Sequence, residues 1–214
     1  MSILSDQDIL FEIQNGNIIF CDPQNSFENL VKNIGNCSVD VTLGEFYYAN
    51  ETKQKFFNPW NRESIEHFWG KQKQSKLVTT EKAEKYKLKI GTKYIKIQPH
   101  QTILGHTNEF IGGVKNITTM MKARSSLGRS CVTVCGDAGW GDVGYVNRYT
   151  MEIHNHTDSP IILIVGKRIA QIIFLRTGET TKQYIGKYQE TSIIEELIER
   201  WKPEMMVPKL YMDF

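Results

Sequence analysis

The chain has 214 residues, 40% of them hydrophobic, which is enough to bury the core of one large domain. Its 26 basic and 24 acidic residues give a formal net charge of +2, and this balance argues against broad nucleic-acid binding. No apolar run approaches the roughly 18 residues of a membrane span, and the N-terminus lacks the basic and apolar regions of a signal peptide. We therefore expect a cytoplasmic protein with no membrane or nucleic-acid partner, whose four cysteines are reduced.

The N-terminal part of the chain predicts a helix and then a strand. Ser5 begins an S-x-x-D pattern before an apolar run that Gly16 follows, as in a short capped helix. In SVDVTLGEFYY apolar and polar residues alternate, which predicts one strand with Asp40 on its polar face.

The composition then changes over residues 49–93. This stretch is rich in Lys, Gln, Glu and aromatic residues, which indicates an insertion or elaborated loop that is partly helical. We interpret its Trp60, Phe68 and Trp69 as packing anchors rather than as a ligand cage.

Short strands and turns follow one another from Tyr94 onward. The strand-like runs are YIKIQP, QTILGHT, CVTVCG, YTMEIHN, IILIV and RIAQIIFL, with Gly, Pro, Asn and Asp between them. This spacing predicts a compact all-β barrel or double sheet. Near the C-terminus Ser192 begins a capping box with Glu195, and one apolar helical face runs from residue 193 to 201. A helical tail is therefore expected at about 191–214.

One carboxylate falls inside the run YTMEIHN. Side chains alternate along a strand, so the face of Thr150, Glu152 and His154 would lie opposite to Tyr149, Met151 and Ile153. A carboxylate on a strand, approached by arginines and hydroxyls, suits proton transfer on a small polar ligand. The alternative is a surface strand with a solvated glutamate.

The segment RSSLGR, residues 124–129, has one arginine at each end and two serines between them, in a turn-prone stretch. Guanidinium groups, hydroxyls and exposed backbone N–H groups together make a phosphate cradle. The alternative is a solvated loop.

Metal-binding patterns are weak. Cys131 and Cys135 would lie on one face of a strand about 13 Å apart, too far to share a metal, so we interpret both as core cysteines. His154 and His156 form an H-x-H pattern that can chelate zinc, but nothing nearby completes a four-ligand set. The motifs of zinc deaminases, P-loop proteins and G-x-S-x-G hydrolases are absent from the sequence.

Motifs spread along most of the chain are similar to those of one family. They are ILSDQDI, CSVDVTLG, ARSSLGR, AGWGDVGY, YTMEI, GKRIAQIIF and GKYQ. In this order they resemble dCTP deaminases of the trimeric dUTPase superfamily. The resemblance implies a mainly β, dUTPase-like barrel or double sheet with short N- and C-terminal helices, in a single domain spanning 1–214.

The resemblance also implies a metal-independent hydrolytic deamination of dCTP to dUTP and ammonia. Glu152 would take a proton from the water that attacks cytosine C4, and return protons to N3 and the departing ammonia. Ser125 and the backbone carbonyl of Ala138 would hold that water. Arg129 would orient Glu152 and keep it charged.

Further residues would bind the nucleotide, by the same resemblance. Asp142 would accept a hydrogen bond from the sugar 3′-hydroxyl, and Tyr145 would pack on the deoxyribose. The remaining substrate-binding residues would be Arg124, Ser126, Thr150, Gln171, Tyr184, Lys187 and Gln189. Mg²⁺ would bridge the phosphates without a direct protein ligand, zinc would play no part, and each active site would be shared between subunits of a homotrimer.

Three departures from the family pattern keep other functions open. Asp137 stands where deaminases usually carry Thr, Tyr145 is the type that dUTPases favour, and TSIIEELIERW replaces the Gly-rich tail after GKYQ. The alternatives are a bifunctional dCTP deaminase and dUTP pyrophosphatase giving dUMP, a dUTPase, and a non-catalytic nucleotide-binding homologue.

Overall fold

The computed structural model describes residues 2–50, 55–189 and 191–213. The first sheet contains β1 (Ser2–Ile3), β14 (Arg168–Arg176), β9 (Ile117–Ala123) and β11 (Trp140–Gly141) in that order, with β3 (Val39–Thr42) also paired to β14. The second contains β10 (Val132–Thr133), β12 (Val146–Asn155), β8 (Thr102–Gly113), β4 (Phe46–Ala49) and β5 (Lys73–Gln74), with β2 (Ile18–Cys21) paired to β8. The third contains β13 (Ile161–Ile164), β7 (Lys93–Ile97) and β6 (Lys76–Leu77).

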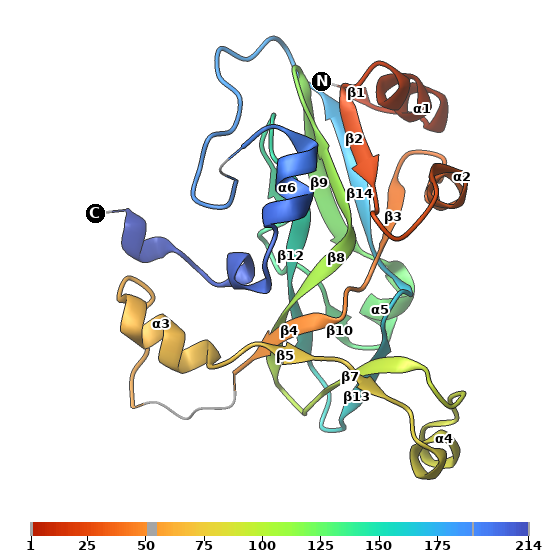
Figure 1. Ribbon diagram of the computed structural model, residues 1–214, viewed down its shortest axis with the longest axis vertical. Helices are drawn as coiled ribbons and strands as arrows, with labels where there is room; N and C mark the ends of the chain where they lie inside the picture. The colour runs from red at the N-terminus through yellow and green to blue at the C-terminus, as the bar shows by residue number, and fades with distance from the viewer. Residues whose placement is uncertain (1, 51–54, 190, 214) are drawn as a thin grey trace.

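Short helices surround these antiparallel sheets (Figure 1). The α-helices are α1 (Asp6–Gln14), α2 (Phe27–Leu30), α3 (Arg62–Trp69), α4 (Thr80–Tyr86), α5 (Ser125–Arg129) and α6 (Ile194–Arg200). Single 3₁₀ turns occur at η1 (Val31–Asn33), η2 (Pro203–Met206) and η3 (Leu210–Met212). The mainly β fold with short terminal helices is therefore confirmed.

The two long strands β8 and β12 form the centre of the second sheet. Their antiparallel register places Glu152 opposite Leu104 and Ile153 opposite Ile103. Met151 and Ile153 are fully buried in the core, whereas Glu152 is only partly buried. The alternation predicted for YTMEIHN is confirmed, and it turns Glu152 away from the main core.

The N-terminal helix begins as predicted. The Ser5 side chain accepts a hydrogen bond from the backbone N–H of Asp8, and the Asp8 carboxylate accepts one from the backbone N–H of Ser5. This reciprocal pair satisfies two N–H groups that the first helical turn would leave free. Gly16 follows the helix with a φ of 67°, a conformation that glycine adopts without strain.

Helix α1 is joined to the sheet by a buried ion pair. Glu12 is 2% exposed, and its carboxylate accepts hydrogen bonds from Arg176 at 2.6 Å and from Asn17 at 2.6 Å. Burial raises the pKa of Glu12, but the bonds from Asn17 and Arg176 outweigh it and hold the pKa below its usual value.

Arg176→Met is expected to lower the free energy of unfolding by about 2 kcal/mol, because a carboxylate would stay buried without its guanidinium partner. The effect is below the usual range for buried pairs because the Arg176 side chain is 37% exposed. Urea unfolding at neutral pH measures the change. Arg200→Met is the control: it removes the exposed pair with Glu196 and should change stability by less than about 0.5 kcal/mol. Equal losses in the two variants would contradict this role of the Glu12 pair.

The single strand predicted for SVDVTLGEFYY is wrong, because the segment forms β3 and β4 with a break around Gly44. At the break the chain packs against the buried ring of His106, and a Cβ on Gly44 would lie 2.0 Å from its Cε1 atom. Asp40 on β3 is 8% exposed, and its carboxylate pairs with Arg168 at 2.8 Å.

The segment that carries Cys131 and Cys135 differs in part from the prediction. Strand β10 covers only Val132–Thr133, and Cys131 and Cys135 on its two sides have positive φ values of 56° and 69°. Cys135 is buried beside Met121, but Cys131 is exposed. The interpretation of both as core cysteines is therefore wrong for Cys131, because the backbone reverses there instead of continuing as a strand.

The segment predicted as an insertion contains two helices, α3 and α4, while residues 51–54 lie outside the described residues. Trp69 is buried and Phe68 packs beside it, whereas Trp60 is 52% exposed and is not a packing anchor. In the tail, α6 begins after Ile193 and receives no cap from a side chain, so the box predicted at Ser192 does not form.

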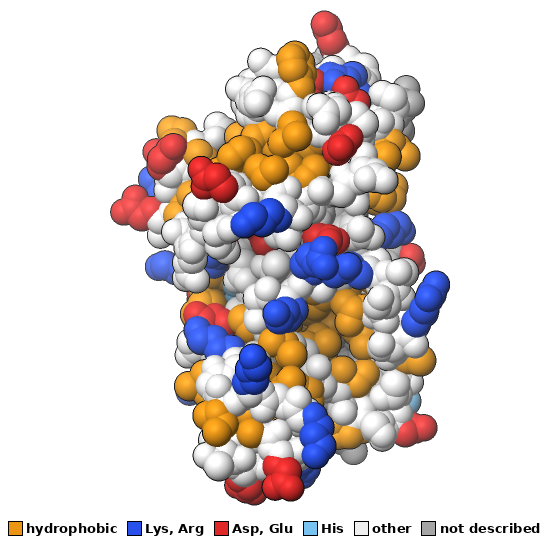
Figure 2. All heavy atoms as spheres, turned by 90° about the vertical axis from the view of Figure 1, so that its right-hand side faces the viewer, with side chains coloured by type: hydrophobic (Ala, Val, Ile, Leu, Met, Phe, Trp, Pro, Cys, Tyr) orange, Lys and Arg blue, Asp and Glu red, His pale blue; other side chains and the backbone are white. Residues whose placement is uncertain are grey.

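The surface carries charges of both signs. Figure 2 shows the face that bears α1, α2 and α5, where basic and acidic side chains are interspersed among apolar patches. None of the helices in the described part of the chain has the length and apolar character needed to cross a lipid bilayer.

Candidate active site

Glu152 lies on β12 and its side chain is partly buried. Its Oε2 atom is buried and has no hydrogen-bond partner among the described residues. Burial raises the pKa of this carboxyl above its usual value, and only a hydrogen bond from its own backbone opposes the shift. A carboxylate that holds its proton more readily than usual is suited to general acid–base chemistry near neutral pH.

Glu152 opens into a pocket of about 430 Å³. A pocket of this volume falls in the range that binds small molecules. The predicted site residues that line it are Ala138, Asp142, Tyr145, Thr150, Glu152 and Tyr184. The structure therefore brings together the predicted general base and four of the predicted substrate-binding residues, from the segments 138–145, 150–152 and 184.

Three tyrosines form the aromatic side of this pocket. The Tyr145 ring packs edge-on against Tyr149 at 5.2 Å and against Tyr184 at 5.1 Å between ring centroids. The Tyr149 hydroxyl is fixed by Thr119 at 2.5 Å. Burial raises the pKa of Tyr145 and of Tyr149, which keeps both phenols neutral. Asp142 lies exposed at the edge of the pocket, so its carboxylate is open to a ligand hydroxyl.

The other predicted residues gather at a second location around α5. The predicted turn RSSLGR is a short helix, and neither Ser125 nor Arg129 lines the Glu152 pocket. Within one chain, Arg129 is thus not placed to orient Glu152. Arg124, which precedes α5, lies 3.5 Å from Asp40, and the Gln171 amide donates to Ser38 at 3.3 Å. Figure 1 shows α5 on the opposite side of the sheets from α3 and the C-terminal tail.

Ser126 belongs to the α5 group, and its backbone carbonyl accepts a hydrogen bond from the Ser130 hydroxyl at 2.9 Å. Ser125, Ser126 and Arg129 on this short helix are exposed, so their hydroxyl and guanidinium donors are accessible to another molecule. The predicted site is therefore divided into two parts, one around Glu152 and one around α5.

Lys187 and Gln189 have partners within the chain. The Lys187 ammonium pairs with the carboxylate of Asp213, near the end of the tail. Gln189 is buried and clamps the backbone, accepting from the Val146 N–H at 2.7 Å and donating to the Gly144 carbonyl at 2.8 Å. Gln189 thus fixes the turn before β12, and the structure gives it no opening toward the pocket.

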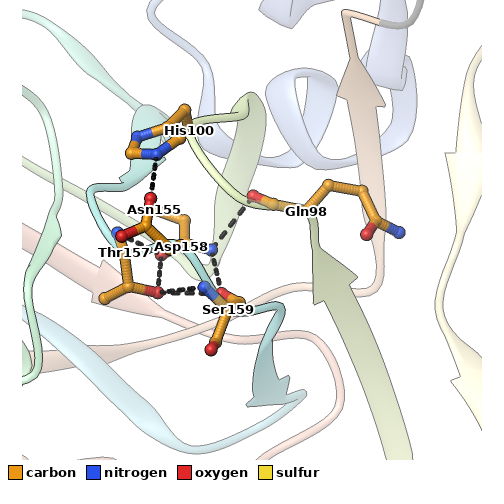
Figure 3. A network of polar contacts seen from close by, with 6 residues as sticks. All are labelled: Gln98, His100, Asn155, Thr157, Asp158 and Ser159. Carbon is orange, nitrogen blue, oxygen red and sulfur yellow. Dashed lines mark hydrogen bonds and ion pairs between the residues drawn. The ribbon is translucent and has the colours of Figure 1, made fainter.

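A polar network fixes the far end of β12, three residues beyond Glu152 (Figure 3). The Asn155 amide donates to the carbonyls of Gln98 at 3.0 Å and Ser159 at 2.8 Å. Its carbonyl oxygen accepts from both the backbone and the hydroxyl of Thr157, each at 2.9 Å. The network closes the turn between β12 and β13 and so holds the strand that carries Glu152.

The two histidines of the H-x-H pattern are engaged with threonines. His154 Nδ1 lies 2.8 Å from the Thr102 hydroxyl, and His156 Nε2 lies 3.1 Å from the Thr133 hydroxyl. Their rings pack edge-on, 4.3 Å between centroids. Within residues 2–50, 55–189 and 191–213, no group of three or more His, Cys, Asp or Glu side chains is arranged to hold a metal.

Residues that the motifs do not contain also line the pocket. Trp69 comes from α3, and Met206, Pro208 and Leu210 come from the C-terminal tail. No periodicity in either segment could indicate this, because the contact depends on two distant pieces of chain meeting over β8. The mostly apolar stretch MMVPKL after Pro203 is a local sign of a buried segment.

Comparison with known proteins identifies the family. A protein-family model described as dCTP deaminase-like matches residues 3–177. A protein of Methanocaldococcus jannaschii named "dCTP deaminase, dUMP-forming" is 35% identical over 180 residues, which cover 80% of this chain and 81% of that protein. A protein of Methanococcus vannielii with the same name is 31% identical over 212 residues, which cover 92% and 96%.

A solved structure supports the fold. The 2′-deoxycytidine 5′-triphosphate deaminase of Agrobacterium tumefaciens aligns with a TM-score of 0.55 at 17% identity, covering 82% of this chain and 48% of that chain. The chain thus spans about half of that structure, and at this identity the similarity bears on the fold alone. The matched family model and the archaeal relatives confirm the family that the motifs predicted. The chain belongs to the dCTP deaminase-like family of enzymes.

Proposed function

We propose that this enzyme is bifunctional, converting dCTP and two waters to dUMP, ammonia and pyrophosphate. The observation that carries the proposal is the buried, unpartnered Oε2 of Glu152 in a pocket shared with Ala138 and Tyr145. The sequence motifs favour dUTP as the product, with dUMP as the alternative. The names of the relatives, which end in "dUMP-forming", favour the alternative.

In the deamination step Glu152 acts as a general base and then as a general acid. It takes a proton from a water whose oxygen bonds to cytosine C4, and N3 gains a proton. Glu152 then takes the proton of the new C4 hydroxyl and gives it to the exocyclic nitrogen. The bond from C4 to that nitrogen breaks, ammonia leaves, and C4 becomes the carbonyl carbon of uracil. The raised pKa of Glu152 supports this double role, because a carboxyl that binds its proton more tightly than usual is a stronger base and can still return the proton as an acid.

The two separate groups of predicted residues support a site shared between copies of the chain. In the proposed homotrimer, Ser125 and Arg129 of a neighbouring copy reach the Glu152 pocket, where the serine and the Ala138 carbonyl hold the water. The neighbouring guanidinium favours the charged form of Glu152 and opposes the effect of burial. The exposed hydroxyl and guanidinium groups on α5 support this arrangement.

The nucleotide is proposed to lie with its sugar against Tyr145 and its 3′-hydroxyl on Asp142, with Thr150 and Tyr184 beside it. Arg124, Ser126 and Gln171 would bind phosphates, and Lys187 would join them by exchanging Asp213 for a phosphate. The guanidinium and amide N–H groups suit phosphate oxygens and not a cation. Mg²⁺ would accordingly be held by the phosphates, where it neutralises their charge.

Product analysis tests the proposal. The enzyme is incubated with Mg²⁺ and either dCTP or dUTP, and ammonia, pyrophosphate and nucleotides are quantified. We expect dUMP, ammonia and pyrophosphate from dCTP. Accumulation of dUTP from dCTP would instead establish a monofunctional deaminase, and pyrophosphate from dUTP alone a dUTPase. Nucleotide binding without any product would indicate a non-catalytic homologue.

A further inference from the structure

An apolar cluster joins α3 to the C-terminal tail beside the Glu152 pocket. Its buried members are Tyr48, Ile65, Trp69, Leu104 and Met206. They come from β4, α3, β8 and η2, and Figure 1 shows α3 and the tail on the same side of the molecule. Trp69 and Met206, here called the α3–tail wall, are 8% and 3% exposed.

This cluster reaches Glu152 through Leu104. The register of β8 and β12 places Leu104 directly opposite Glu152, and cross-strand neighbours have Cβ atoms about 5 Å apart on one face of a sheet. Leu104 and both residues of the α3–tail wall line the same pocket as Glu152. Ile65 belongs to the same cluster but faces a different pocket, between α3 and the tail.

We propose that Trp69 and Met206 are positioning residues, which keep bulk water, other than the reacting water, away from the Glu152 carboxylate and thereby set its protonation. This inference rests on the proposed function of Glu152 as the proton-transfer group. It gives a role to Trp69, which lies in none of the motifs, and to Met206, which lies outside residues 3–177. The wall adds no charge of its own. Its effect is to remove the water that would stabilise a carboxylate anion, which favours the protonated form.

Other titratable groups around Glu152 come from different elements. Burial raises the pKa of Cys135 and of Tyr145, and the negative charge of Glu152 raises both further. Asp142, Tyr149, Tyr184 and Tyr188 share the pocket. In the proposed trimer, Arg129 of a neighbouring copy also faces it. Substitutions in the wall leave all these groups in place, so a change in the titration of Glu152 reports on water access.

Met206→Gln tests the wall, because glutamine has similar length but attracts water. Met206→Leu is the conservative variant, and Ile65→Val is the matched control in the same cluster. The assembled enzyme is labelled with ¹³C at glutamate side chains, and Glu152 is titrated by NMR, its signal being identified by its loss in Glu152→Gln. The dependence of kcat/KM for dCTP on pH is recorded in parallel.

We expect the pKa of Glu152 to fall by about 0.5 to 1 unit in Met206→Gln and to stay unchanged in Met206→Leu and Ile65→Val. A general base must be deprotonated, so the acidic limb of kcat/KM should move to lower pH by the same amount. Trp69→Leu, which leaves room for water, is the second test should Met206→Gln not fold.

An unchanged pKa of Glu152 in folded Met206→Gln or Trp69→Leu would overturn the inference, as would an equal shift in Ile65→Val. The NMR titration needs no turnover. A shifted pKa in an enzyme that releases no ammonia would therefore reject the proposed function while retaining the role of the wall.

Discussion

Glu152→Gln is expected to slow ammonia release from dCTP by about 10²–10⁴-fold, the usual contribution of a positioned general acid–base group. Glutamine keeps the shape of the side chain but cannot take a proton from water. Nucleotide affinity should remain within a few-fold, because the proposed sugar and phosphate contacts come from other residues. Single-turnover ammonia release and calorimetric titration with dCTP measure the two quantities.

The chain provides a matched control for this substitution. Glu109 on β8 is also a buried glutamate, 1% exposed, but it accepts hydrogen bonds from the backbone and hydroxyl of Thr42 at 2.9 and 2.7 Å. It does not line the pocket. Glu109→Gln should therefore retain the specific activity of the folded enzyme. Deamination that survives in Glu152→Gln, or is lost equally in both variants, would contradict the assignment of Glu152.

The free energy of unfolding is expected to fall by up to about 3 kcal/mol between pH 6.5 and pH 4 because of His106. This residue is 1% exposed, and burial lowers its pKa to about 4, with the nearby Arg148 acting in the same direction. Its ring is bonded as a neutral imidazole: Nδ1 donates to the Thr107 carbonyl at 2.8 Å, and Nε2 accepts from the Phe46 N–H at 3.3 Å. Protonation of Nε2 would displace that N–H.

The sign follows from proton binding. In this pH range the unfolded chain, with a histidine pKa near 6.5, binds a proton that the folded protein excludes. Acid therefore favours unfolding until the pH falls below the folded pKa. Glu109 acts in the opposite direction, because burial raises its pKa. For this reason the slope is obtained as the difference between the native protein and His106→Gln.

Urea unfolding between pH 4 and pH 7.5 measures this difference. His106→Gln should be less dependent on pH than the native protein, whereas His100→Gln, at an exposed position, should run parallel to it. Parallel curves for the native protein and His106→Gln would show that His106 is not the group responsible.

The local patterns predicted the elements that depend on neighbouring residues. The cap at Ser5 forms because its partner Asp8 is three residues away, and the alternation around Glu152 follows from the geometry of any strand. The break at Gly44 was not predictable, because it depends on close packing against the ring of His106, which comes from β8. The reversal at Cys131 likewise overrides a run of residues with good strand propensity.

The candidate site was predictable in its residue types but not in its arrangement. The motifs identified Glu152, Asp142 and Tyr145, which the structure brings into one pocket. The spacing from Arg124 to Glu152 could not indicate that α5 lies away from the Glu152 pocket in the folded chain. Spacing fixes the length of chain between two motifs, but it does not tell whether they meet in one copy or between two.

The packing of α3 against the tail has a consequence for the exchange of parts between homologues. Ile65 and Trp69 of α3 belong to one apolar cluster with Met206 of the tail. Each segment therefore buries its apolar side chains only while the other is present. A chimera that received α3 without the tail, or the tail without α3, would expose this surface to solvent and tend to aggregate. We expect soluble chimeras only when α3 and the tail are transferred together from the same parent protein.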